Sequence, residues 1–399
     1  MTRPLEGIRV LDMSRAQMGP YAGAILADMG ADVIKVEPKT GDFARGSFLS
    51  SWYPPGTPDC YCLAHNRGKR SLAIDYHNVK GKEIVLRFAG KSDVFLQNFR
   101  PGIPDRLGLG YKDVKDRNPS IIYAHVSGYG RSGPLSSAPA FDLIGQAMGG
   151  IMTVTGDPKG PPTPVGAAIA DQAGAMAVAL GIMTALFVRE RTGTGQELDV
   201  SMLDVQLALQ TWEITHYLNT GKLPPKGGRG LGLIPGLWCI FRCKDDRWIA
   251  IAGAKDPRWP GLCRALRVEY LEHDPRFETA ENREKNREKL IRILDKIFLE
   301  QNADHWLERL REEDQIIGPV YNYADITAHP HLQENKMLLE IDHHSGQKAK
   351  TIGNPIKLSK TPVEVRSADP ALGQHTEEVL LELGYSWKEI STLSEEGVV

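Results

Sequence analysis

One carboxylate stands inside the most apolar segment of this sequence. The segment GPPTPVGAAIADQAGAMAVALGIMTALFV runs from Gly160 to Val188, and Asp171 is its single charged residue. Burying an unpaired carboxylate costs free energy unless the group is protonated, ion-paired or hydrogen-bonded. Because a helix is expected to follow, Asp171 taken alone fits two roles: a helix cap, or an activated carboxylate that works as a base or nucleophile.

A second pattern, near the N-terminus, has the outline of a dinucleotide site. A strand, a glycine-bearing turn, a helix and a second strand lead to Glu37, eighteen residues after Gly19. The turn SRAQMGPYAG lacks the G-x-G-x-x-G fingerprint and has Pro20 where a free amide would be needed. An NAD-dependent oxidoreductase is therefore an alternative that the missing glycines disfavour.

These residues must be positioned by an alternation of strands and helices in the first third of the chain. Apolar, β-branched runs predict strands at 8–14, 32–38, 71–76, 93–98 and 121–127, and a helix is expected at 19–29. Such alternation predicts an α/β fold with a parallel, doubly wound sheet. Ligands bind beyond the carboxyl ends of the strands in such sheets, so we expect a site in the loops 14–19, 37–45, 98–106 and 127–130.

After the apolar segment the pattern changes. We expect a strand at 196–202 and one helix over 203–218, and then a linker rich in proline and glycine. Beyond the linker, LWCIFRCKDDRWIAIAG predicts a hairpin that turns at 245–246, which favours a smaller α+β unit. The charged run ENREKNREKLIRIL predicts an exposed helix face on which Glu281 and Lys285 are spaced to pair.

The composition is that of an ordinary globular protein. Apolar residues make up 41% of the 399, charged residues 25%, and the net charge is -2, which indicates neither a nucleic-acid nor a membrane partner. The apolar run at 173–188 is shorter than the roughly 20 residues of a membrane span, so we predict a buried helix in a cytoplasmic protein. Five cysteines without zinc-site spacing predict a reducing setting and no metal.

Several stretches, in order and spanning nearly the whole chain, together resemble the family III CoA-transferases. They are PLEGIRVLDMSRAQMGPYAGAILADMGADVIKVEP, NRGKRSLAIDY, QNFRPGIPDRLGLGY, HVSGYGRSGP, PVGAAIAD and LGQHTEEVLLELGY. The resemblance implies a Rossmann-like large domain built from both chain ends, a small domain between them, and ring-shaped chains interlocked in a dimer. On this basis we expect a large domain at 1–200 with 330–399, a linker helix and glycine-rich loop at 201–236, and a small domain at 237–329.

The resemblance gives Asp171 the role of nucleophile. It implies a reaction in which CoA moves from an acyl-CoA donor to a free carboxylic acid through an aspartyl-CoA thioester, without a metal. Such a carboxylate must be ionised at neutral pH and yet poorly hydrated. We predict that free amides and the positive end of the following helix hold Asp171 ionised.

The resemblance also places CoA beside four groups of residues. They are Gln17 and Met18; Ile74, Asp75, Tyr76 and His77; Asn98, Phe99, Arg100 and Arg106; and Ser127, Gly128, Tyr129 and Gly130. Arg100 and Arg106 are expected to meet the phosphates, with Arg45, Lys69 and Arg70 as further candidates. Some relatives have an arginine where this chain has Pro38, and Lys39 or Arg45 is the candidate replacement.

The glycine-rich stretch KGGRGLG, at 226–232, resembles a loop that covers the aspartyl intermediate in relatives. Gly227, Gly228 and Gly230 would permit it to move, although a plain interdomain linker is equally open. The sequence does not reveal which acids are exchanged; Trp52, Tyr53 and Trp238 are candidates for substrate walls.

An α-methylacyl-CoA racemase of the same fold is the closer alternative. Racemases have a His-Asp pair after the SGYG-like turn, for acid and base chemistry on opposite faces of the substrate. Here the pair is Phe141 and Asp142, so the histidine that would act as one of the two acid–base groups is missing. His125 is near in sequence but falls inside an expected strand, which favours a structural role.

Overall fold

The computed structural model describes residues 2–46, 53–54, 56–234, 236–253 and 256–399. The chain divides into two compact units. The first unit comprises Met1–Gly149, Gly166–Leu209 and Pro330–Val399, and the second comprises Gly150–Val165 and Gln210–His329.

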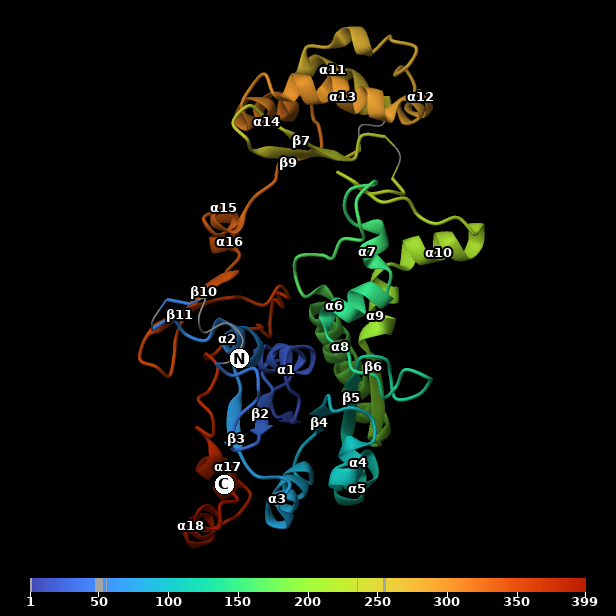
Figure 1. The fold of residues 1–399 in the computed structure, drawn as a ribbon. Helices are drawn as coiled ribbons and strands as arrows, with labels where there is room; N and C mark the ends of the chain where they lie inside the picture. The colour runs from blue at the N-terminus through green and yellow to red at the C-terminus, as the bar shows by residue number, and fades with distance from the viewer. Residues whose placement is uncertain (1, 47–52, 55, 235, 254–255) are drawn as a thin grey trace. The chain divides into compact units, whose positions relative to one another are not determined.

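A parallel six-stranded sheet, in the order β3-β2-β1-β4-β5-β6, is the centre of the first unit (Figure 1). The strands are β1 (Arg9–Asp12), β2 (Asp32–Glu37), β3 (Arg70–Ala73), β4 (Val94–Gln97), β5 (Ile122–Ser127) and β6 (Gln196–Ser201). This order is that of a doubly wound dinucleotide-binding sheet, in which the direction of winding reverses between β1 and β4. The predicted parallel α/β sheet is confirmed.

The sheet has a hydrophobic core on each face because successive side chains of a strand point to opposite faces of the sheet. Val10 of β1 packs in the core that holds helices α1 and α8, and Leu11 packs in the core that holds α3, α17 and α18 (Figure 1). The helices of this unit are α1 (Met18–Asp28), α2 (Cys60–Asn66), α3 (Val79–Ala89), α4 (Ile103–Leu107), α5 (Tyr111–Arg117), α6 (Asp142–Met148), α8 (Ile169–Thr192), α9 (Met202–Leu209), α16 (Pro330–Glu334), α17 (Thr376–Glu382) and α18 (Trp387–Glu395). A hairpin of β10 (Leu338–Asp342) and β11 (Lys348–Ile352) completes the unit.

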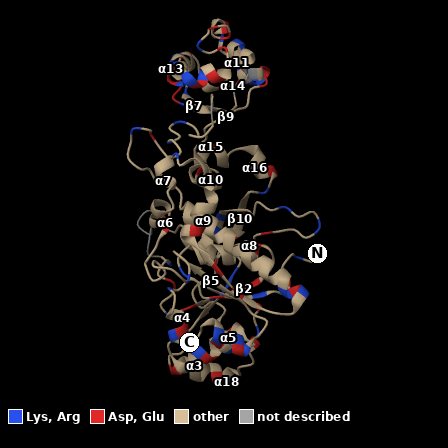
Figure 2. Ribbon diagram, turned by 90° about the vertical axis from the view of Figure 1, so that its right-hand side faces the viewer, with Lys and Arg blue, Asp and Glu red and all other residues tan. Residues whose placement is uncertain are grey.

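Helix α8 is long and apolar enough to cross a membrane by length and composition, the one such helix among the described residues. Its connectivity favours a core helix, because α8 lies between the parallel neighbours β5 and β6. One of its faces, including Val178 and Ile182, is buried in the core with α1. Figure 2 shows the helix mostly uncharged, with Lys or Arg and acidic positions gathered near its end at Arg189–Arg191.

The second unit has its own antiparallel sheet, β7 (Cys239–Arg242), β8 (Trp248–Ile251) and β9 (Ile317–Pro319). The predicted hairpin at 245–246 is confirmed, with Asp246 in the left-handed conformation that its turn requires. The helices here are α7 (Ile151–Val154), α10 (Thr211–Thr220), α11 (Trp259–Leu266), α12 (Ala280–Lys285), α13 (Arg287–Phe298), α14 (Ala303–Glu312) and α15 (Tyr323–Thr327), with short 3-10 helices η2 (Asp256–Arg258) and η3 (Glu269–Leu271).

Two expected features differ in the structure. The single helix expected over 203–218 is two helices, α9 and α10, and the boundary between the units falls at this break. Relative to the expected domain limits, 150–165 lies in the second unit, because the amide of Gly227 donates to the carbonyl of Val154 and ties the two segments together. Helix α9 lies in the first unit, where it packs on α8.

Candidate active site

A cavity of about 850 Å³ lies at the carboxyl ends of the sheet in the first unit. The loops after β1, β4 and β5 line it, and β1 and β4 are the neighbours between which the winding reverses. This is where ligands bind in doubly wound sheets. Residues from all four loops that the strand pattern indicated line the cavity, and the loop after β2 does so through Phe43.

The loop after β1 is held in place by polar side chains from neighbouring strands. The Asn98 side chain accepts from the backbone N–H of Arg15 and donates to its carbonyl, each at 2.7 Å. Ala16 has a positive φ of 60°, and its N–H donates to Asp42 at 3.1 Å. Gly19 then has no room for a Cβ, which would lie 2.4 Å from Ser14. These contacts fix Gln17 and Met18 at the cavity wall.

Asp171 also lines this cavity, as the third residue of α8. The residue that precedes the helix is Ala168, which has no side-chain acceptor, so the capping role weighed for Asp171 is wrong. Asp142, the first residue of α6, caps α8 from outside: its Oδ1 accepts from the N–H of Ala170 at 2.7 Å and of Asp171 at 3.2 Å. Asp142 is a site residue whose role sequence spacing could not reveal.

This arrangement changes the electrostatics expected for Asp171. Its own amide and that of Ala170 already bind the Asp142 carboxylate, so they are not free to stabilise the Asp171 anion. Burial, and then the negative charge of Asp142, raise the pKa of Asp171 to about 7. The prediction of a carboxylate held fully ionised by helix amides is therefore wrong. The group instead titrates near neutral pH, the range in which an acid–base or nucleophilic carboxyl is most useful.

Tyr61 is a second residue that the sequence did not single out. It lines the cavity from α2, and its ring packs on His65 with centroids 4.5 Å apart. Burial, and then the charge of Asp171, raise the pKa of Tyr61, so its phenol stays protonated at neutral pH. Burial lowers the pKa of His65 to about 4, so its imidazole is neutral. The cavity wall near Asp171 therefore includes a neutral phenol, that of Tyr61, which packs on a neutral imidazole.

The cavity collects most of the predicted CoA residues. Those that line it are Gln17, Met18, Tyr76, His77, Asn98, Phe99, Arg100, Ser127 and Gly128. The others, Ile74, Asp75, Arg106, Tyr129 and Gly130, are not among the lining residues. Ile74 is fully buried in the core with α3, and Gly130, with a φ of 83°, turns the chain after β5.

Arg15 is a cation at the cavity that no sequence motif indicated. It lines the wall, donates to the Tyr76 hydroxyl, and lies 5.4 Å from the ring centroid of Phe99. Together with Arg100 it gives the cavity two guanidinium groups. Both guanidinium groups lie at the strand ends, where they could bind the phosphates of a polyanionic ligand.

The three further phosphate candidates are engaged in ion pairs within the protein. Lys69 is completely buried against Asp12 at 2.8 Å, and Arg45 makes a two-pronged pair with Glu37 at 2.7 Å. Arg70 pairs with acidic residues of β2 and α17. None of the three lines the cavity that contains Asp171, and their charges already have partners, which disfavours them as phosphate contacts. Lys39 is exposed and donates to the Gly397 carbonyl.

The glycine-rich loop is anchored within the second unit. Gly228 donates to the carbonyl of Gly156 at 3.1 Å, and Lys226 donates to the carbonyl of Gly160 at 2.8 Å. A Cβ on Gly230 would lie 1.7 Å from the Trp238 carbonyl oxygen, so close backbone packing requires glycine there. Of the proposed substrate walls, Trp52 lies outside the described residues, and Tyr53 and Trp238 are not among the residues that line the cavity.

The histidine considered for the racemase alternative is turned away from Asp171. His125 lies in β5, as expected, where Nδ1 contacts Gln97 at 3.0 Å and Nε2 contacts Glu197 at 3.1 Å. It is not a lining residue of the cavity that contains Asp171, whereas Phe141 is. The site therefore has a phenylalanine where a racemase would need an acid–base histidine.

Known proteins resemble this chain in both sequence and structure. The sequence model described as CoA-transferase family III matches residues 5–376. The human succinyl-CoA:glutarate CoA-transferase is 33% identical over 402 residues, covering 100% of this chain and 90% of that protein. The formyl-CoA:oxalate CoA-transferase of Streptomyces avermitilis is 34% identical over 419 residues, covering 100% of both chains. A CAIB/BAIF family protein from Brucella suis superposes with a TM-score of 0.86 at 31% identity, covering 96% of this chain and 100% of that one.

A parallel doubly wound sheet with a carboxyl group in a cavity at its switch point is the arrangement of an α/β protein with a ligand site at its strand ends. The chain belongs to CoA-transferase family III, and it is an enzyme of the CoA-transferase type. These matches favour the transferase over the racemase and over the NAD-dependent oxidoreductase.

Proposed function

We propose that this enzyme moves CoA from an acyl-CoA donor to a free carboxylic acid through a thioester on Asp171. The observation that carries the proposal is the setting of that carboxyl. It lines a cavity of about 850 Å³, has a pKa raised to about 7, and makes no ion pair with a cation among the described residues. A carboxylate in this state is poorly hydrated and available to attack an acyl carbon.

The proposed chemistry exchanges one activated acyl bond for another. The Asp171 carboxylate attacks the donor thioester carbonyl, the carbon–sulfur bond breaks, and a mixed anhydride and CoA thiolate form. The thiolate then attacks the Asp171 carbonyl, which gives aspartyl-CoA and releases the donor acid. The acceptor carboxylate attacks this thioester, and the expelled thiolate takes the acceptor acyl group from the second anhydride. Asp171 is left as a carboxylate, so no net energy source is consumed.

CoA is proposed to enter at the strand ends. The aromatic rings of Tyr76 and Phe99 and the guanidinium groups of Arg15 and Arg100 supply the apolar and cationic surfaces that pantetheine and phosphates need. For the acceptor we propose a small dicarboxylic acid. The acceptors in the names of the human and Streptomyces relatives, glutarate and oxalate, both carry two carboxyl groups.

Transfer of heavy oxygen tests this route. The protein is incubated with succinyl-, acetyl- or formyl-CoA and with acceptors labelled with heavy oxygen in both carboxyl groups, among them oxalate, glutarate and acetate. New thioesters are identified by mass spectrometry, and the peptide that contains Asp171 is weighed. The route predicts one acceptor oxygen in Asp171 after a single turnover and up to two after repeated turnovers, because the bridging oxygen of the second anhydride comes from the acceptor. Turnover that leaves this peptide unlabelled contradicts an aspartyl intermediate, and faster turnover with acetate than with both diacids contradicts the acceptor class.

We also propose the interlocked homodimer that the family resemblance implies. The face of α8 opposite the core exposes Met176, Leu180 and Phe187, at 52%, 63% and 57% of their surface. An apolar stripe of this kind is unusual on a free surface and typical of an interface. Light scattering should give twice the chain mass, and a monomer at micromolar concentration would contradict the dimer.

A further inference from the structure

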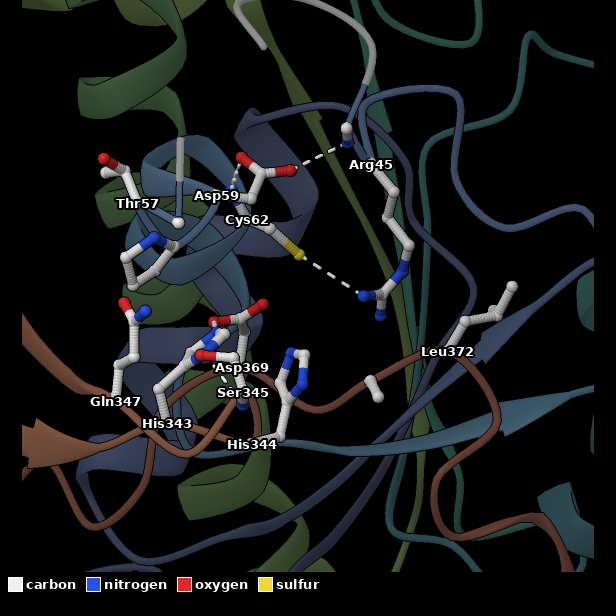
Figure 3. Close-up of a pocket in the computed structure, with 14 residues that line it drawn as sticks. Arg45, Thr57, Asp59, Cys62, His343, His344, Ser345, Gln347, Asp369 and Leu372 are labelled. Carbon is white, nitrogen blue, oxygen red and sulfur yellow. Dashed lines mark hydrogen bonds and ion pairs between the residues drawn. The ribbon is translucent and has the colours of Figure 1, made fainter. Parts of the chain in front are cut away.

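A second pocket in the first unit, of about 450 Å³, has its own cluster of metal-ligating side chains (Figure 3). His343 and His344 lie in the turn after β10, and Asp369 lies in the segment between β11 and α17. One ligand atom from each of these three residues lies within 4.8 Å of the other two. None of the three lines the cavity that contains Asp171.

The spacing of the two buried ligands is that of neighbours around one small ion. His343 Nε2 and Asp369 Oδ1 are 3.3 Å apart, and both side chains are more than nine-tenths buried. Two ligand atoms about 2.0 Å from a tetrahedral ion are separated by about 3.3 Å. The third ligand is His344, which is exposed on the turn. A rotation of its side chain can bring its imidazole to the same ion as the two buried ligands.

Both buried ligand atoms lack a hydrogen bond among the described residues. His343 Nε2 and Asp369 Oδ1 point at one another, but neither makes a hydrogen bond of acceptable geometry. Buried polar atoms are nearly always hydrogen-bonded, and an unsatisfied pair is a sign of an absent ion or water. The other nitrogen of His343 contacts the Ser345 hydroxyl at 2.8 Å, the type of outer contact that orients a metal-binding imidazole.

The surroundings favour a cation and hold the ligands rigidly. Arg45 lines the pocket, but its charge is neutralised by Glu37, so Asp59 and Asp369 leave the pocket acidic. Cys62 lines the same pocket. Beneath the cluster, Leu63, Ala349 and Ala368 form a small hydrophobic core, so chain segments that are far apart in sequence are fixed beside one another.

We propose that His343, His344 and Asp369 form a site for one Zn²⁺ ion, with its fourth position open to the pocket and to Cys62. Two imidazoles and a carboxylate are a ligand set that zinc prefers, and three protein ligands with one open position are a common zinc arrangement. The cysteine spacing on which the sequence analysis based its expectation of no metal could not detect this site, because its ligands are far apart in the chain.

The test measures zinc on the full-length protein without a histidine tag. After dialysis against buffer that contains a weak chelator, zinc is measured by mass spectrometry and its affinity by competition with a coloured chelator. We expect one zinc per chain in the wild type, and His343→Ala, His344→Ala and Asp369→Ala should each weaken binding by at least about a hundredfold. Cobalt in place of zinc should give the visible absorption of a four-coordinate ion.

His273→Ala is the matched control, since His273 is an exposed histidine of the second unit. It should retain one zinc per chain. His344 is exposed, so His344→Ala is expected to fold even where the buried substitutions do not, and circular dichroism checks this. Wild-type protein that holds no zinc, or folded His344→Ala that binds zinc as tightly as His273→Ala, overturns the site. Neither result bears on the transferase proposal, which rests on a different cavity.

Discussion

Acidic side chains of the first unit occupy two contrasting regions close to the strand ends. Beneath the loops after β1 and β2, each carboxylate has a cation: Asp12 with Lys69 at 2.8 Å, and Asp42 with Lys35 at 3.0 Å. In the cavity, Asp171 instead lies beside another acid, Asp142, and burial together with that neighbouring charge raises its pKa. Lys69 remains the cation of its pair at neutral pH, although burial lowers its pKa to about 8.

The carboxylates of the two regions differ in role: the paired ones stabilise the fold, and the one in the cavity is reactive. A buried carboxylate that is paired with an ammonium group uses its oxygen lone pairs as hydrogen-bond acceptors, so it is a weak nucleophile. It instead positions the loops that form the cavity. A carboxylate that shares a desolvated space with another acid is destabilised as an anion and therefore disposed to form a bond. Burial desolvates the carboxylates of both regions, and the charge of the neighbouring group distinguishes their roles.

The largest effect is expected at the reactive carboxyl. Asp171→Ala removes the proposed nucleophile and should lower the transfer rate by at least about a thousandfold, because the variant lacks the carboxyl group that would carry the covalent intermediate. The measurement is formation of new acyl-CoA by mass spectrometry. Circular dichroism should match the wild type. Retention of more than a few per cent of the rate would place the chemistry elsewhere.

Breaking a paired carboxylate should instead damage the fold. Lys69→Met leaves Asp12 charged and unpaired at a position with no solvent exposure. Removal of one partner of a buried pair costs about 3–5 kcal/mol. Urea unfolding should show this loss, and Asp12→Asn combined with Lys69→Met should recover part of it. A single variant as stable as the wild type would show that the pair is not needed for support.

The raised pKa of Asp171 also has a cost in stability. The folded pKa of about 7 is above the ordinary value of 3.8, so the folded state binds the proton more tightly than the unfolded chain. The wild type should therefore lose stability as pH rises from about 4 to about 7, by up to about 4 kcal/mol in free energy of unfolding. Asp171→Asn cannot ionise and should lack this loss. Equal slopes of stability against pH for the two proteins would contradict the raised pKa.

Asp142→Asn separates the charge of that residue from its capping role. The amide oxygen can still accept from the N–H groups of Ala170 and Asp171, so α8 keeps its cap. Loss of the negative charge should lower the pKa of Asp171, and the acid limb of kcat/KM should move to lower pH by roughly one unit. Asp142→Ala is the comparison, since it removes charge and cap together. An unshifted limb in Asp142→Asn would mean that burial alone sets the pKa.

The sequence predicted the sheet and singled out Asp171, but not the groups that surround each carboxylate. The alternation of β-branched runs and helices predicted the parallel sheet, and the apolar setting of Asp171 marked it as the residue to explain. The role of Asp142 was not predictable, because a cap that comes from another helix leaves no local pattern and Ala168 gives no signal. Local capping rules assume that the acceptor precedes its own helix.

Charge pairing was also hidden from the sequence. Lys69 and Arg45 appeared as free cations near strand ends, and only the packing shows that Asp12 and Glu37 neutralise them. Arg15 was passed over for the opposite reason: nothing local distinguishes it, and its place at the cavity depends on the Asn98 side chain that holds its loop. Long-range contacts of this kind decide which charges are available to a ligand.

The smallest effect is expected where a pair of the same length is exposed. Glu281 and Lys285 of α12 lie 2.8 Å apart, the same separation as Asp12 and Lys69, but both side chains are about two-thirds or more exposed. Water already solvates each charge, so Lys285→Met should leave the thermal midpoint within about 1 °C of the wild type. Lys69→Met, the same substitution at the same distance, should shift it by several degrees. If the two variants unfold at similar temperatures, then distance rather than burial governs these pairs, and the contrast between supporting and reactive carboxylates loses its physical basis.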